Sequence, residues 1–493
     1  MEYFSAYKTI RNKLRRFAPR SVVECALNVL WTPHENKLKM LEQAPWQALL
    51  LVKWALIDRQ ASDRTGQQLS QEKFYVVRQE LWAFPEKVQR AGGEPIELFM
   101  RQLTYQQIEF QRSETPIFAR QPALLGALDQ SHPLRRMFFE KAGLDVLDFL
   151  DLSLATYSAI VSGKRYIPFG WFDPLRKRYG TAIDAYIRAV SLNYVELLEF
   201  LRGQPDSNQR WASEFFEFTP IKRYPLFRQG DMLQAWHPMV FSRGIETFVH
   251  AVLSEADAQN YMNLYSKIFE DHVIELIRQT GRPFLDEGTI RTIIGRNERV
   301  SEALIPLAGG NLLVEAKAGV FDEPVMTVGD PTFIARRVQP LVKAVSQARS
   351  VASKIHSSDK CPDVARSNTR NFLIVVTNRL LNISRGTRLE ALCGPDLFEQ
   401  SRRDVEQYLP LENVYFVGID EFEHFTVACS DPTFDPIRFL EESVARDANP
   451  ATATFYFGDH FAHVKGVDLK GRFSIAAISA AEKRLAAALG GEE

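Results

Sequence analysis

A pair of glycines, Gly309-Gly310, lies between two short apolar runs and constrains how this part of the chain can fold. The runs are Ala303–Leu307 and Leu312–Val314. Adjacent glycines readily adopt the positive φ angles of a tight hairpin turn, so the pattern predicts two antiparallel strands joined at this pair. Because side chains alternate between the two faces of a strand, Glu315 and Lys317 share one face of the second strand.

Charged side chains gather at one end of this predicted hairpin. Folding about the glycines places Glu302 roughly opposite Lys317 and diagonal to Glu315. Charges in an otherwise apolar hairpin are costly to remove from water unless they pair or hold a metal ion. The sequence therefore predicts a candidate site made of two carboxylates and one ammonium group.

The composition describes an ordinary globular protein of more than one domain. A chain of 493 residues exceeds what one hydrophobic core accommodates and predicts two or three domains. The net charge is −1, so nucleic acid could be bound only through local basic patches. No apolar run is long enough to span a membrane, and the basic N-terminal stretch lacks a hydrophobic signal core. We therefore expect a cytoplasmic protein without a membrane partner.

Common cofactor and metal motifs are missing from the sequence. The four cysteines are scattered, which argues against a disulfide framework or a zinc ribbon. The tightest histidine pair, His460 and His463, has no further cysteine or histidine pair to complete a metal site. Neither a glycine-rich phosphate loop nor a nucleophile-elbow motif occurs. The carboxylate–lysine group is thus the leading candidate for chemistry.

Hydrophobic periodicity divides the chain into a helical first half and a mixed second half. Residues 1–205 show helical spacing almost throughout, and the segment 202–210 has the composition of a linker. We expect a mixed domain of helices and strands at 215–435. A C-terminal extension of helix, hairpin and helix should occupy 436–493.

Several short segments carry more specific expectations. Thr289–Ile294 is expected to be a strand and Asp396–Tyr408 a helix. Pro340 should divide the helical segment that follows Asp330-Pro331. Aromatic and β-branched runs predict strands at Phe215–Ile221, Tyr224–Gln229 and Met232–Trp236, and an aromatic hairpin at Thr454–Val464.

Residues 261–420 resemble the PD-(D/E)xK nuclease superfamily, also called the restriction-endonuclease-like fold. Glu315-Ala316-Lys317 is similar to the (D/E)xK signature, and Glu302 resembles the acid at the end of the preceding strand. Glu270 matches a glutamate that many members carry on the preceding core helix. A glutamine on the following helix would be Gln347, or less favourably Gln339. The resemblance implies an α+β or α/β multidomain protein with a restriction-endonuclease-like core around a central mixed sheet.

The match departs from the family pattern in one position. The first strand acid of the family is usually Asp, whereas here it is Glu302, so Asp286 and Glu287 remain alternatives. A second Glu-x-Lys, at 35–37, lies in a polar stretch without a strand or a partnering acid. In a purely structural interpretation, Glu315 and Lys317 form an exposed ion pair, which would contribute less than about 1 kcal/mol to the stability of the fold. The apolar runs on both sides favour a covered sheet instead.

The resemblance also implies an activity and its partners. Glu302, Glu315 and Glu270 would hold Mg²⁺ or Mn²⁺, and Lys317 and Gln347 would complete the catalytic group. The expected reaction is hydrolysis of phosphodiester bonds, in DNA more than in RNA, in defence against foreign nucleic acid. The helical residues 1–205 would sense or bind the target, and a second copy of the chain or a partner protein of a defence system could assemble with it.

Two other functions are compatible with the same sequence. One is a catalytically inert module that keeps the nuclease fold and binds nucleic acid or protein. The other is a helical scaffold followed by an unrelated domain of helices and strands. The joint presence of Glu302, Glu315 and Lys317 argues against the inert module, and a metal ion held between the two glutamates would exclude the scaffold.

Overall fold

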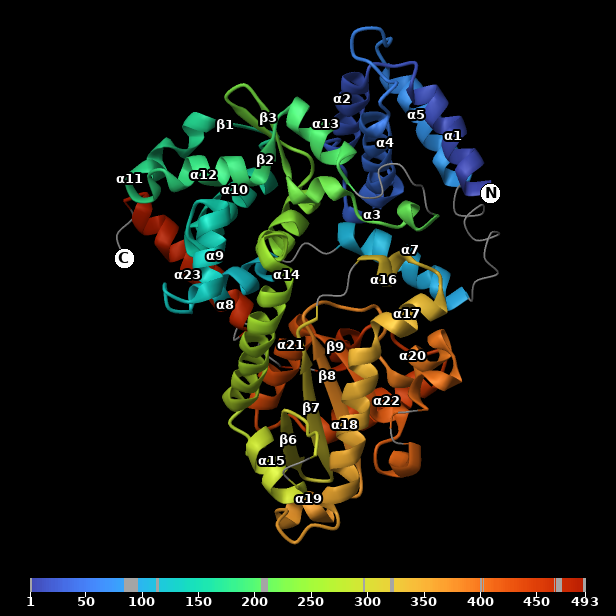
Figure 1. Cartoon of the computed structure of the whole chain (residues 1–493), viewed down its shortest axis with the longest axis vertical. Coiled ribbons are helices and arrows are strands. Elements are labelled where there is room, and N and C mark those ends of the chain that lie inside the picture. Colours follow the sequence, from blue (N-terminus) through green and yellow to red (C-terminus); the bar gives the residue numbers. More distant parts are fainter. Residues whose placement is uncertain are drawn as a thin grey trace. The chain divides into compact units, whose positions relative to one another are not determined.

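The computed structural model divides the chain into two units, each with its own core (Figure 1). Unit 1 comprises residues 1–258 together with 474–493, and unit 2 comprises 259–473. Both are mainly helical and each contains one small mixed sheet, as expected for an α+β multidomain protein. The structure describes residues 2–83, 96–111, 115–204, 212–295, 298–319, 323–399, 401, 403–464, 466 and 472–490.

Unit 1 begins with helices packed around α4 (Pro45–Ile57). Nearly all sides of α4 are apolar, and Trp54 is completely buried in the core of unit 1. Prolines begin α4 and α2 because a fixed φ suits the first helical position, where no N–H donor is needed. The helices up to α5 are α1 (Glu2–Leu14), α2 (Pro19–Leu30), α3 (Lys37–Glu42), α4 and α5 (Gln71–Gln79).

The middle of unit 1 is also helical, as the periodicity predicts. Its helices and 3₁₀ turns are η1 (Glu80–Ala83), α7 (Ile96–Gln111), η2 (Thr115–Ala119), α8 (Arg120–Gly126), α9 (Pro133–Ala142), α10 (Val146–Val161), η3 (Phe169–Leu175), α11 (Arg176–Tyr179), α12 (Ala182–Val190) and α13 (Tyr194–Arg202). Asn193 caps α13 by accepting a hydrogen bond from the backbone N–H of Glu196 (3.0 Å).

A four-stranded sheet completes unit 1, with the order β1-β4-β3-β2. Strands β3 (Leu226–Gln229) and β4 (Met232–Ala235) confirm two of the predicted strands and form an antiparallel pair. Their neighbours are β1 (Tyr166–Pro168), antiparallel to β4, and β2 (Ser191–Leu192), parallel to β3.

The prediction of a strand at Phe215–Ile221 is wrong. Two 3₁₀ turns, η4 (Ala212–Phe215) and η5 (Pro220–Arg223), overlap the two ends of this stretch, and residues 216–219 between them form no strand. Pro220 has no N–H to donate to a sheet, and the Thr219 hydroxyl accepts a hydrogen bond from the Ile221 N–H (3.3 Å). The turn therefore replaces the ladder that the aromatic pattern predicts.

Helix α14 (Pro238–Gln279) carries the chain from unit 1 into unit 2. Apolar residues recur at helical spacing on both sides of residue 257, and α14 covers both stretches. The backbone leaves helical geometry at Asp257 (φ −162°, ψ 90°), next to the boundary between the units. Gly281 then adopts a positive φ of 68°, as expected of a residue that ends a helix.

The sheet of unit 2 has five strands in the order β5-β6-β7-β8-β9. β7, β8 and β9 run parallel to one another, whereas β5 and β6 are added antiparallel at one edge. Helix α18 (Gln339–Ile355) packs on β7 and β8, and α21 (Ile419–Ser430) packs on β8 and β9 (Figure 1). The strands are β5 (Leu285–Asp286), β6 (Ala303–Leu307), β7 (Gly310–Lys317), β8 (Asn371–Thr377) and β9 (Val414–Gly418).

Every residue of β8 and β9 is buried, and so is all of β7 except Lys317. Both faces of the strands are therefore covered, which is typical of parallel sheets. The remaining helices and turns of unit 2 are α15 (Glu287–Ile294), α16 (Glu323–Thr327), α17 (Pro331–Arg337), α19 (Asp363–Ser367), α20 (Gly386–Cys393), η6 (Pro395–Phe398), η7 (Arg403–Tyr408), η8 (Leu411–Asn413), α22 (Pro436–Ala448) and η9 (Phe457–His463).

Three expectations for unit 2 are corrected by the structure. The segment Thr289–Ile294 is helical, because Asp286 caps α15 through the Thr289 N–H (2.8 Å). The helix expected at Asp396–Tyr408 is divided into η6 and η7. The hairpin expected at Thr454–Val464 is instead the 3₁₀ turn η9. Pro340 does divide its segment, since α17 ends at Arg337 and α18 begins at Gln339.

The units differ from the domain ranges expected at 1–205, 215–435 and 436–493. The 202–215 window lies inside unit 1, where Trp31 donates to the backbone oxygen of Ala235 (2.8 Å). The last helix, α23 (Phe473–Ala488), belongs mostly to unit 1. Its Arg484 forms an ion pair with the buried Asp151 of α10 (2.6 Å).

Candidate functional site

The hairpin of β6 and β7 positions the predicted site. The pairs run from Leu307 with Gly310 to Ala303 with Val314, so the turn consists of residues 308 and 309. Gly309 has a φ of 87°, which favours glycine. Gly310 belongs to the strand, and a Cβ on it would lie 2.9 Å from the Ile437 side chain. Only one glycine of the pair therefore forms the turn.

This register corrects the expected pairing by two residues. Extended by one position, it places Glu302 opposite Glu315, and not opposite Lys317. The Lys317 side chain nevertheless reaches both carboxylates. Its Nζ donates to Glu315 Oε2 (2.7 Å) and to Glu302 Oε1 (3.2 Å). The structure thus brings the three predicted residues together at the end of β7.

The two carboxylates are shielded from solvent. The Glu315 side chain is 0% exposed, Glu302 is 17% exposed and Lys317 is 20% exposed. Glu315 Oε1 and Glu302 Oε2 are buried and have no hydrogen-bond partner within the described part of the chain. Buried anionic oxygens without a donor are costly, and hard carboxylate oxygens are the ligands that Mg²⁺ prefers. These two atoms therefore fit a divalent cation.

The charges of the site are strongly coupled. Burial raises the pKa of Glu315 well above its ordinary value, and the Glu302 carboxylate raises it further, against the opposing effect of Lys317. Burial lowers the pKa of Lys317, but the carboxylates of Glu315 and Glu302 outweigh that effect and raise it. The ammonium group therefore stays charged, whereas Glu315 is biased toward its neutral form, and a cation bound between the two glutamates would favour ionisation of Glu315.

Glu270 and Gln347 lie near this group. Burial raises the pKa of Glu270 on α14, and the Glu302 carboxylate raises it further, while Lys317 lowers it. Glu270 is therefore within electrostatic range of the site. Gln347 on α18 donates to the backbone oxygen of Val300 (3.4 Å), two residues before Glu302. Gln339 donates instead to the Ala335 oxygen on the preceding turn (3.0 Å), so Gln347 is the better placed glutamine.

The alternative acids have other partners. Asp286 caps α15, and the hydrogen bonds from Thr289 hold its pKa below the ordinary value. Glu287 pairs with Arg291 on the exposed side of the same helix (2.5 Å). Of the three acids considered for this position, Glu302 is the one that contacts Lys317.

The donor set is small for a metal site. Among the residues that the structure describes, no group of three or more His, Cys, Asp and Glu side chains could hold an ion. Glu302 and Glu315 supply two carboxylates, and Lys317 lies between them. Further ligands would have to come from water, from Glu270 or from the substrate, which is common for Mg²⁺.

The histidine pair has a structural explanation. His460 is completely buried, and its Nε2 lies 3.2 Å from Asp447 Oδ2 and 3.1 Å from the Thr454 hydroxyl. Tyr415 donates to the same Asp447 oxygen (3.3 Å). These contacts join η9 to α22 and β9, whereas His463 lies at the end of η9.

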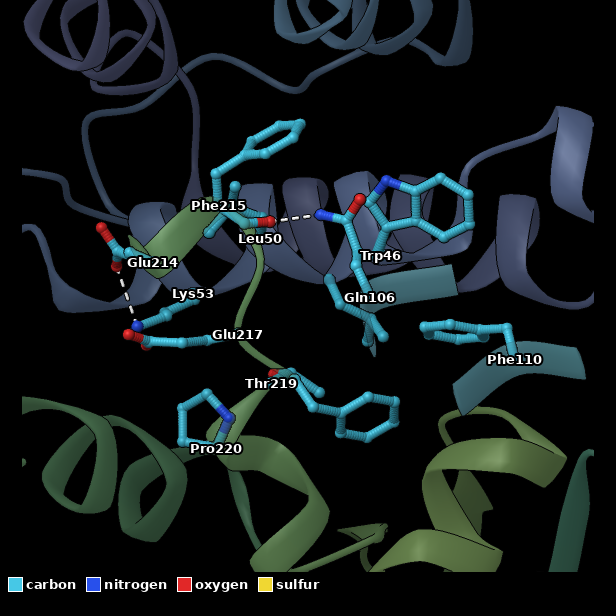
Figure 2. Close-up of a pocket in the computed structure, with 12 residues that line it drawn as sticks. Trp46, Leu50, Lys53, Gln106, Phe110, Glu214, Phe215, Glu217, Thr219 and Pro220 are labelled. Carbon is cyan, nitrogen blue, oxygen red and sulfur yellow. Dashed lines mark hydrogen bonds and ion pairs between the residues drawn. The ribbon is translucent and has the colours of Figure 1, made fainter. Parts of the chain in front are cut away.

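A hollow in unit 1 lies between α4, α7 and the segment 214–220 (Figure 2). Lys53 forms an ion pair there with Glu214 (2.8 Å), and Gln106 donates to the backbone oxygen of Phe215. Its volume is about 20 Å³, which accommodates little more than a water molecule. This hollow is therefore too small for a substrate.

No protein-family model, curated protein or solved structure matches the chain. In the part of the chain that the structure describes, no helix combines the length and the apolar character needed to cross a membrane.

Proposed function

We propose that this protein is a metal-dependent nuclease that hydrolyses phosphodiester bonds at the Glu302–Glu315–Lys317 site. The observation that carries the proposal is the pair of buried oxygens without a hydrogen-bond donor, Glu302 Oε2 and Glu315 Oε1. They lie beside a charged lysine at the end of an antiparallel hairpin that continues into parallel strands. This arrangement supports the resemblance to the PD-(D/E)xK nucleases.

Glu302 and Glu315 would hold Mg²⁺ or Mn²⁺, and Glu270, which is within electrostatic range of Glu302 and Lys317, would contribute through water. A divalent ion bound there would neutralise a nonbridging phosphate oxygen and lower the pKa of a water molecule. The carboxylates would set the position of that charge, because Glu315 lies in β7 and Glu302 directly precedes β6. Burial of Glu315 keeps competing water away from it.

Lys317 would act on the water and on the phosphate. A protonated amine has no lone pair and is a poor metal ligand, but it donates up to three hydrogen bonds. Its stem is flexible enough to move from the carboxylates toward an incoming phosphate. There the ammonium group would orient the water and offset the charge that develops in the transition state. Gln347 would support the backbone that carries Glu302.

The substrate class follows from the same resemblance. We infer DNA in preference to RNA, and defence against foreign nucleic acid as the setting. Unit 1 would contribute target recognition, and a second copy or a partner protein would assemble with the chain. The coupled acids and lysine support the chemistry, whereas the choice of nucleic acid rests on the family likeness.

The test is incubation of the purified full chain with plasmid, single-stranded DNA and total RNA, each with Mg²⁺, Mn²⁺ or EDTA. We expect cleavage of the DNA substrates with a metal ion and none with EDTA. Cleavage that EDTA leaves unchanged, or no cleavage of any substrate with either metal, would overturn the proposal.

One observation favours a second candidate, an inert binding module. Lys317 already neutralises part of the charge on both glutamates, as a structural ion pair would. Such a module would bind nucleic acid or protein without cleaving it. Cleavage of nucleic acid in the presence of Mn²⁺ separates the two functions, because the inert module would leave every substrate intact.

A further inference from the structure

Unit 1 contains a cleft of about 720 Å³ that is unrelated to the proposed nuclease site. This volume lies within the range of small-ligand sites in proteins. The cleft is bounded by one face of α2, the start of β1, the start of α13 and the β3–β4 hairpin. Its polar and aromatic lining includes Arg20, Asn28, Arg165, Tyr166, Tyr194 and Gln229.

Arg165 is held in this cleft by neutral groups. Its Nη1 donates to Asn28 Oδ1 (3.2 Å), and its Nε and Nη2 each lie 3.0 Å from the Gln234 amide oxygen in the orientation that satisfies both side chains. Gln234 is only 2% exposed, so its amide is a fixed support. No carboxylate pairs with Arg165 among the described residues. The guanidinium group is thus oriented while its charge stays available to an anion.

Arg20 adds a second available charge. Its guanidinium lies 4.4 Å from the centre of the Tyr194 ring, and no carboxylate in the described part of the chain pairs with it. The nearby Asp63 accepts hydrogen bonds from the Arg20 backbone N–H (2.9 Å) and the Tyr194 hydroxyl (2.5 Å). The cleft therefore offers positive charge along the edge formed by α2.

The other charges of the cleft do not cancel these two arginines. Arg228 also lines the cleft, and its guanidinium is paired with Glu196 (2.7 Å). Glu24 is the one acid among the lining residues. Arg20 and Arg165 thus have no ion-pair partner among the described residues, while Asp63 and Glu196, which lie next to the lining, are engaged by Tyr194 and Arg228. Glu24 is the acid left to oppose the two guanidinium groups, which favours an anionic ligand.

Tyr166 provides an aromatic surface beside the charge. It is 47% exposed and follows Arg165, whose guanidinium lies 5.3 Å from the ring centre. An exposed tyrosine next to an oriented arginine suits a ligand that has a planar ring and an acidic group. Gln229 is exposed at the hairpin and can donate to or accept from the edge of such a ring.

We propose that this cleft binds a nucleotide. The phosphate would contact Arg165 and Arg20, and the base would stack on Tyr166. Nucleotides combine the anion and the planar ring that the lining residues match, and inorganic phosphate alone would leave most of the volume empty. The same chemistry occurs in a free nucleotide and in a nucleotide unit of a single strand, and the test separates these two sources.

The test is calorimetric titration of the full chain, in EDTA, with AMP, ATP, adenosine, inorganic phosphate, and oligo(dA) or oligo(dT). The wild type should bind AMP or ATP, or an oligonucleotide, more tightly than adenosine or phosphate. If only free nucleotides bind, the ligand of the cleft is a free nucleotide. If only oligonucleotides bind, the ligand is a nucleotide unit of a single strand. Equal binding of phosphate and AMP, or no binding of any probe, would overturn the proposal.

Substitutions place the binding in the cleft. Arg165→Ala and Tyr166→Ala should each weaken binding about tenfold or more, because they remove a charged hydrogen-bonding group and a stacking surface. Arg188→Ala is the control, since Arg188 is an exposed arginine of α12 outside the lining residues. Tyr166→Phe should retain binding, because the phenyl ring is enough for the base to stack on.

Unchanged affinity in both alanine variants, or an equal loss in Arg188→Ala, would refute the assignment. If Arg165→Ala lowers the melting temperature, the assignment of binding to the cleft is tested by comparing Tyr166→Ala, which should lose affinity, with Tyr166→Phe, which should keep it. Because the readout is binding in EDTA, the result is independent of whether the chain cleaves nucleic acid.

Discussion

Lys317 and Glu315 are adjacent in the site, yet their substitution should have different effects. We expect Lys317→Ala to abolish cleavage while Mn²⁺ binding is largely retained, because an ammonium group is no metal ligand. Glu315→Ala should lose both, since it removes a buried ligand oxygen and leaves Lys317 without its closest partner (2.7 Å). Calorimetric Mn²⁺ titration and nuclease activity measure the two effects.

Melting curves are the control for these two variants. Neither change should unfold the protein, because apolar residues of β6 and β7 carry the packing of the hairpin and Glu315, with its raised pKa, can be neutral when Lys317 is absent. If both variants melt far below the wild type, Glu315 and Lys317 form a structural ion pair. Equal loss of Mn²⁺ binding in the two variants would likewise contradict the separate roles.

At the scale of elements, the hairpin was predictable because glycines and apolar alternation are local signals. The register differs by two residues because the turn consists of residues 308 and 309, and Gly310 lies in β7, where an added Cβ would come 2.9 Å from the Ile437 side chain. That contact comes from a residue far along the chain. The strand expected at Phe215–Ile221 is wrong for a local reason, since Pro220 and the Thr219 hydroxyl favour a 3₁₀ turn and the aromatic residues are buried without a strand.

Gly309 offers a test of the hairpin turn. Gly309→Ala should reduce the free energy of unfolding by about 1 kcal/mol, because an alanine is strained at a φ of 87°. Gly319→Ala is the matched control, since no heavy atom lies within 4 Å of the added Cβ and its φ is not positive. Chemical unfolding followed by circular dichroism measures both. Equal stability of the two variants would contradict the assigned turn.

Asp447 should make the stability of unit 2 depend on acid pH. Burial raises its pKa, but hydrogen bonds from His460 and the Thr454 N–H outweigh burial and hold the pKa below the ordinary value of 3.8. A depressed folded-state pKa contributes stability above the unfolded pKa, and this stability is lost as the pH falls through the folded value. The expected window therefore lies below about pH 4.

Asp447→Asn should destabilise the protein at pH 7 by about 1–3 kcal/mol, because a buried network loses its charged acceptor. The difference from the wild type should shrink as the pH falls below 4. Asp359→Asn is the control, since that side chain is fully exposed. Urea unfolding at several pH values tests this, and a difference that grows on acidification would contradict the account.

At the scale of the whole molecule, the sequence predicted a mainly helical first part and a mixed sheet in the second. The unit boundary was not predicted, because it lies at a kink inside α14, near Asp257, and not in the linker-like segment 202–210. The return of α23 to unit 1 brings Arg484 to Asp151, a contact between residues far apart in the sequence. Site residues on one hairpin were identified, whereas the cleft of unit 1 assembles residues from four separated segments.

Arg484 tests the assignment of the last helix. Arg484→Ala should destabilise unit 1 by about 2–4 kcal/mol, because it leaves the carboxylate of Asp151, 1% exposed, without its cation. Arg438→Ala, which removes an exposed pair within α22, should have little effect. Differential scanning calorimetry should show a shift in the melting of one unit only. A shift of both units, or of neither, would contradict the division.

The most direct test of the nuclease claim is single-turnover cleavage of a labelled DNA by the wild type, Lys317→Ala and Lys39→Ala. Lys39 forms an exposed ion pair on α3 and serves as the matched lysine control. With Mg²⁺, the wild type and Lys39→Ala should cleave at equal rates, and Lys317→Ala should be slower by a factor of about 10² or more. EDTA should stop all three. Cleavage by Lys317→Ala at the wild-type rate would contradict the account.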